Sequence, residues 1–137
     1  MPVPPDRPDE LLAEAHRWLR QAQDDLFGAR AMLDRDDVAP RLACFLAQQA
    51  AEKAIKARLT ALGRAFPRVH DLIALRSLLP DGSGVGAEAA DLAKLTVWAV
   101  EARYPGDLPE ASRADAIAAV TAATAVVESA WSAVPAA

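Results

Sequence analysis

The stretch PRLACFLAQQAAEKAIKARLTAL, residues 40–62, decides the fold class of this chain. Small apolar residues recur in it every three or four positions, which is the period of one face of an α-helix. Pro40 suits the first turn of a helix, and Gly63, directly after the stretch, suits its C-terminal cap. The stretch therefore predicts a helix whose stripe of small side chains lets a second helix approach closely. The alanines of this stripe are Ala43, Ala47, Ala50, Ala54, Ala57 and Ala61.

The same helical period extends over most of the 137 residues, and prolines separate its segments. Strand-forming residues are sparse and never alternate over a useful stretch. We predict an all-α fold, an up-and-down bundle of four main helices plus one short helix. The predicted helices span residues 9–33, 40–62, 71–79, 87–103 and 110–132. They form one domain over residues 9–133, which follows a flexible N-terminal segment of residues 1–8.

Composition limits the classes of protein to which the chain can belong. With 15 Lys and Arg against 19 Asp and Glu, the net charge is −4, so any contact with nucleic acid must come from a local basic patch. One Cys and two His, far apart in the sequence, make a poor set of zinc ligands, and we predict neither a metal nor a cofactor. No signal peptide and no membrane span of ~20 apolar residues is present, which predicts a cytoplasmic protein without membrane contact.

The polar residues of the stretch are the first candidates for a binding site. Gln49, Lys53 and Lys56 fall on one face of the predicted helix, and Glu52 lies four residues before Lys56, with which it can pair. One interpretation is a wall of amide and ammonium donors that faces a ligand. The other is a solvated face with one ion pair inside the helix.

Other candidates lie near the ends of the predicted helices. His70, at a junction between loop and helix, could act as acid or base beside the positive charge of Arg64, or could simply hydrogen-bond the loop. Arg103 could complement its helix dipole or bind a phosphate, with Tyr104 stacking on a base. Trp98 shares a face with charged residues, which favours a contact between subunits.

Four segments of the sequence together resemble the HEPN domain family. They are RWLRQA (17–22) with DDL (24–26), ACFLAQQAAEKAIKA (43–57), HDL (70–72) and ARYP (102–105). The resemblance is greatest to stand-alone prokaryotic HEPN proteins and to the C-terminal domain of sacsin. It implies a bundle that forms a homodimer, with a cleft that receives a nucleotide or RNA, and a minimal nucleotidyltransferase as a possible partner protein. The residues expected in the cleft are Gln49, Lys53, Lys56, His70, Arg103 and Tyr104.

The resemblance also implies an alternative function. In many HEPN branches an Arg, four to six residues and a His form a metal-independent ribonuclease site, which toxins of toxin-antitoxin pairs use. No His follows Arg103 here, whereas Arg64 and His70 have that spacing in the loop before the third predicted helix. We therefore expect a non-catalytic binding module, and keep as alternatives a ribonuclease toxin with Arg64 and His70 at its site, and a purely structural dimer.

Overall fold

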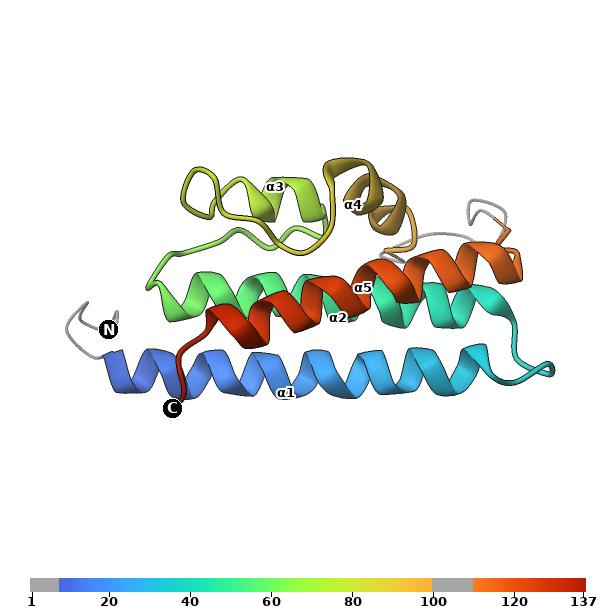
Figure 1. The fold of residues 1–137 in the computed structure, drawn as a ribbon, viewed down its shortest axis with the longest axis horizontal. Helices are drawn as coiled ribbons and strands as arrows, with labels where there is room; N and C mark the ends of the chain where they lie inside the picture. Colours follow the sequence, from blue (N-terminus) through green and yellow to red (C-terminus); the bar gives the residue numbers. More distant parts are fainter. Residues whose placement is uncertain (1–7, 100–109) are drawn as a thin grey trace.

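The computed structural model describes residues 8–99 and 110–137 of the chain (Figure 1). The described part is helical, which confirms the predicted all-α bundle with its five helices. In chain order the helices are α1 (Pro8–Leu33), α2 (Pro40–Ala61), α3 (Leu72–Arg76), α4 (Ala89–Thr96) and α5 (Arg113–Ala133). Residues 1–7 of the predicted flexible segment lie outside the described residues.

The helix α2 is the centre of the bundle, because it packs against all four other helices. Figure 1 shows α1 along one side of α2, α3 and α4 on the opposite side, and α5 lying across α1 and α2. The predicted stripe of small side chains makes this possible: Ala43, Ala47, Ala50, Ala54 and Ala57 are all fully or almost fully buried. Because an alanine adds little bulk beyond the backbone, neighbouring helices can approach α2 closely.

Local capping explains where several helices begin and end. Leu62 caps α2 and the following Gly63 has a φ of 69°, the left-handed conformation that the sequence predicts there. The Asp71 side chain accepts hydrogen bonds from the amides of Ile73 and Ala74 and so starts α3. A capping box between Ser112 and Asp115 starts α5, three residues later than expected.

The helix α4 is shorter than the predicted 87–103. It ends at Thr96, whose hydroxyl donates to the carbonyl of Leu92 and accepts from the amide of Leu72 at the start of α3. The next amides, of Trp98 and Ala99, bond three residues back instead of four, so the chain leaves the α-helix in a tight turn. Arg103 and Tyr104 lie outside the described residues.

The structure corrects the prediction for Trp98. Its side chain is half-buried and packs against the core instead of standing exposed on a polar face. The reason is that α5 brings Ala119 and Ala122 to the same hollow beside α4. The contact between subunits that Trp98 favours therefore stays a prediction, now for a half-buried side chain.

The helix α5 is apolar and long enough to cross a membrane by length and composition. Seven of its residues are buried, and the helix packs against α1, α2 and α4. These seven residues line the interior of the bundle.

Candidate functional site

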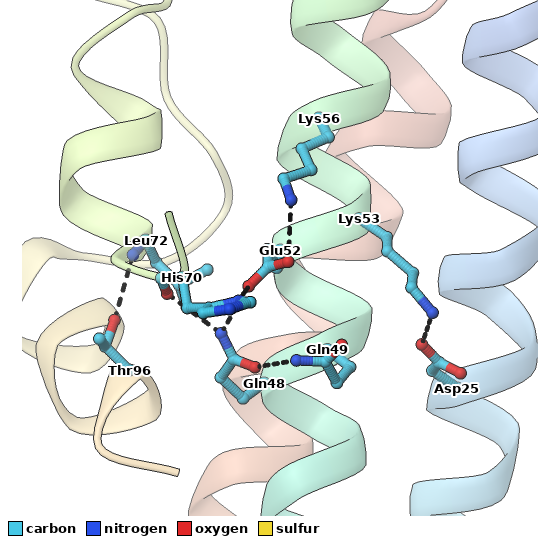
Figure 2. A network of polar contacts seen from close by, with 9 residues as sticks. All are labelled: Asp25, Gln48, Gln49, Glu52, Lys53, Lys56, His70, Leu72 and Thr96. Carbon is cyan, nitrogen blue, oxygen red and sulfur yellow. Dashed lines mark hydrogen bonds and ion pairs between the residues drawn. The ribbon is translucent and has the colours of Figure 1, made fainter. Parts of the chain in front are cut away.

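The polar face of α2 is the candidate site. Figure 2 shows this face between α1 on one side and α3 and α4 on the other, with α5 behind α2. Side chains from α2 and from the segment that leads into α3 meet on it in a connected network.

A buried carboxylate, that of Glu52, lies at the centre of the network. Its residue is only 4% exposed, and three side chains donate hydrogen bonds to it. His70 Nδ1 lies 2.7 Å from Oε1, Gln48 Nε2 lies 3.2 Å from Oε1, and Lys56 Nζ lies 3.0 Å from Oε2. The buried negative charge is therefore compensated by polar partners on both oxygens.

These contacts decide the protonation state of Glu52. Burial raises the pKa of the carboxyl group, but the hydrogen bonds from His70, Lys56 and Gln48 together outweigh it and hold the pKa below its ordinary 4.5. The carboxylate is thus ionised at neutral pH and acts only as an acceptor. It follows that Nδ1 of His70 carries the proton of their hydrogen bond.

The position of His70 is fixed from two directions. Its backbone carbonyl accepts a hydrogen bond of 3.1 Å from Gln48, and its ring contacts Glu52. The next residues cap and begin α3, so the loop is held between α2 and α3. About a third of the His70 side chain remains exposed, at the surface of the network.

Lys56 is held between a carboxylate and two aromatic rings. Its Nζ lies 5.6 Å from the ring centroid of Trp18 on α1 and 5.6 Å from that of Phe66 in the loop. The two rings contact each other edge to face, with centroids 6.3 Å apart. The side chain of Lys56 is only 12% exposed, so its charge is removed from most of the solvent and stabilised by Glu52 and the ring faces.

The remaining predicted residues of α2 lie beside this cluster. Lys53 forms an ion pair of 2.6 Å with Asp25 of α1, and both side chains are about four-fifths buried. Gln49 donates a hydrogen bond of 2.7 Å to Gln48 and so joins the network. The face is therefore not a solvated surface, and the predicted pair of Glu52 with Lys56 is confirmed.

The structure shows Arg64 in a separate contact. Its guanidinium donates to the carbonyl oxygen of Leu78, at 2.8 Å, and so holds the chain after α3. The structure therefore brings Gln49, Lys56 and His70 into one network with Lys53 beside it, while Arg64 makes a separate contact.

Sequence reasoning did not count four members of the cluster among the site residues. Gln48 and Glu52 were recoverable in part, because they precede Lys56 at steps of four residues on one helical face. Nothing in the sequence pattern brings the rings of Trp18 and Phe66 to Lys56. In the part of the chain that the structure describes, no three His, Cys, Asp or Glu side chains gather where a metal could bind.

Comparisons with known proteins agree with this architecture. The family model of the HEPN domain matches residues 15–132. The crystal structure of TT1696 from Thermus thermophilus is similar, with a TM-score of 0.72 and 28% sequence identity over 87% of this chain and 97% of that one. ST0689, an archaeal HEPN homologue, shares the fold with a TM-score of 0.63 and 24% identity over 88% of this chain and 98% of its own. No curated protein matches the sequence. From the family match over most of its length, the chain belongs to the HEPN domain family.

Proposed function

We propose that this protein is a non-catalytic HEPN module that binds a nucleotide or RNA through the polar face of α2. One observation carries the proposal: Lys56 and His70 contact the same buried carboxylate, beside two aromatic rings. Cationic side chains bind phosphate and aromatic rings stack on bases, so the cluster combines the two kinds of group that a nucleotide needs.

Because the chain is acidic overall, binding of an anionic ligand depends on side chains that are held in fixed positions. With a net charge of −4, the protein attracts an anion weakly over long distances. Affinity must then come from groups that are already in place when the ligand arrives, since less side-chain entropy is lost on binding. The hydrogen bonds to Glu52 provide such fixed positions. Gln49 and Lys53 belong to the proposed site as well, and Arg103 and Tyr104, which lie outside the described residues, stay predicted members of it.

Two partners belong to the proposal. HEPN domains generally function as dimers, and we expect a homodimer in the cytoplasm whose cleft includes this face. A minimal nucleotidyltransferase is the proposed partner protein, to which the module would present its substrate. A stable dimer interface buries more than ~1,000 Å² in total. Light scattering that finds only monomer at micromolar concentration would remove the dimer from the proposal.

Calorimetry with ATP, GTP and a short single-stranded RNA tests the binding function. We expect weak to moderate binding that weakens with added salt, because the contacts are charged. Lys56→Gln should reduce it, whereas Lys94→Gln, an exposed lysine on α4, should leave it unchanged. Absence of any heat or chemical-shift response with all three ligands contradicts the proposal.

A ribonuclease is the second candidate, and one contact favours it. The carboxylate of Glu52 holds Nδ1 of His70, as a carboxylate orients the histidine in many sites of general acid–base catalysis. The cation that such a reaction needs at the phosphate would be Lys56 or Arg64. A toxin of this kind would cut RNA without a metal.

A further inference from the structure

We propose that Glu52 is a positioning residue of the binding site: it fixes His70 and Lys56 relative to each other so that both meet one ligand. This inference rests on the function proposed above. It assigns to the buried carboxylate a role in ligand binding, beyond its place in the packing of α2.

The two oxygens of Glu52 serve two different parts of the chain. Oε1 accepts from His70, which belongs to the segment before α3, and Oε2 accepts from Lys56, one turn further along α2. A shift of the carboxylate would therefore move both partners. Gln48 strengthens the arrangement, because its amide donates to Oε1 and also to the carbonyl of His70.

A purely structural role explains the burial of this charge poorly. An ionised carboxylate that is 4% exposed loses most of its hydration, and replacing a buried ion pair by well-packed apolar side chains of similar volume is often neutral or stabilising. The carboxylate instead fixes the orientation of the side chains that donate to it. It accepts from Nδ1–H of His70 and so sets the plane of the ring, which remains about one-third exposed. Lys56 is held by the same group and by the rings of Trp18 and Phe66.

The test measures binding of ATP and of a short RNA with a 5′-phosphate to the full chain and its variants. Glu52→Gln keeps the shape of the side chain but cannot accept from both partners, and we expect the affinity to fall about tenfold. In a His70→Ala background, Glu52→Gln should lower the affinity clearly less, because the histidine that Glu52 positions is already absent. Glu128→Gln, on the exposed side of α5, is the matched control and should bind as the wild type does.

A second variant keeps the charge. Glu52→Asp retains a carboxylate but withdraws it by one methylene group, so a positioning role predicts reduced affinity even though the charge is unchanged. This variant decides the question if the Gln variant does not fold, which circular dichroism will show. Wild-type affinity in Glu52→Asp would show that only the charge matters and would overturn the positioning role.

A spectroscopic measurement needs no variant and no ligand. The ¹⁵N chemical shifts of the His70 ring should show the proton on Nδ1 in the wild-type protein, and Glu52→Gln should change them. A neutral ring with its proton on Nε2, or unchanged shifts in the variant, overturns the positioning role. Failure of the wild-type protein to bind either probe instead overturns the proposed function, so the two failures are distinguishable.

Discussion

His70 and Glu52 are 18 residues apart in the sequence, yet Nδ1 of the imidazole lies 2.7 Å from Oε1 of the carboxylate. This contact joins the segment before α3 to the central helix of the bundle. It also lies next to the contact of Glu52 with Lys56, so an imidazole and an ammonium group share one buried charge. The stability of the protein and its binding of ligands should both depend on this carboxylate.

The first prediction concerns stability in acid. Because its folded-state pKa is depressed, Glu52 contributes stability that is present above the ordinary value of 4.5 and is lost as the pH falls below it. Glu52→Gln should lower the free energy of unfolding at pH 7 by about 3 kcal/mol, since it leaves buried partners of the carboxylate uncompensated. Urea unfolding between pH 7 and pH 3 measures both effects.

The variant should also lose less stability than the wild type on acidification, because the titrating group is gone. Glu128→Gln, on an exposed position, controls for the loss of one negative charge. Parallel curves of stability against pH for wild type and Glu52→Gln would contradict the prediction.

The second prediction concerns the thiol of Cys44. Burial, and to a smaller extent the charge of Asp115, raise the pKa of this thiol to about 11. The native protein should therefore react very slowly with a thiol reagent at pH 8 and rapidly once unfolded in urea. Since the pKa is raised above 9.0, the thiol contributes stability below pH 9 that is lost as the pH approaches 11. Rapid labelling of the native protein at pH 8 would show that the side chain is accessible.

The third prediction compares two glycines that both have a positive φ. A Cβ added at Gly86 would lie 2.3 Å from the carbonyl oxygen of Ala125 on α5, whereas a Cβ at Gly82 would meet nothing within 4 Å. Gly82→Ala should cost only the left-handed backbone strain, about 1–2 kcal/mol. Gly86→Ala should cost at least about 3 kcal/mol, because the strain is joined by a clash with backbone. Equal thermal stability of the two variants would contradict the close packing of the backbone at Gly86 against α5.

The fourth prediction concerns the ion pair of Lys53 with Asp25, which joins α2 to α1. The side chains are about one-fifth exposed, so the coupling energy should be close to 1 kcal/mol, the upper end for partly solvated pairs. A double-mutant cycle with Lys53→Met and Asp25→Asn measures it. If Lys53 also contacts a phosphate, Lys53→Ala should weaken binding of ATP while the bundle stays folded. Additive effects of Lys53→Met and Asp25→Asn on the free energy of unfolding would mean that the ion pair contributes nothing to stability.

The fifth prediction concerns catalysis. An acid–base ribonuclease needs a histidine at the 2′-hydroxyl and a cation at the phosphate, and no His follows Arg103 in this chain. We expect the isolated protein to cut structured and single-stranded RNA poorly or not at all in EDTA, which excludes metal-dependent contaminants. Efficient cutting that His70→Ala and Arg64→Ala both abolish would instead place an active site in the loop before α3.

The sequence predicted the long helices well, because the pattern that specifies each helix lies within its own residues and their neighbours. Periodicity placed α1 and α2, and Pro40 and Gly63 marked the ends of α2 to within one residue. The local pattern did not predict where α4 ends. At that end the Thr96 hydroxyl accepts a hydrogen bond from the amide of Leu72 in another element, and no pattern around residue 96 contains that contact.

The sequence by itself determined the helical class, the stripe of small side chains along residues 40–62 and the pair of Glu52 with Lys56, because residues four apart on a helix always lie close together. Only the tertiary structure decided that this pair is buried and that His70, Trp18 and Phe66 surround it. Those partners come from α1 and from the loop before α3, so their meeting depends on how the helices pack. The same packing excludes water from Glu52. Without water to solvate the charge, the hydrogen bonds from protein groups are what stabilise the carboxylate.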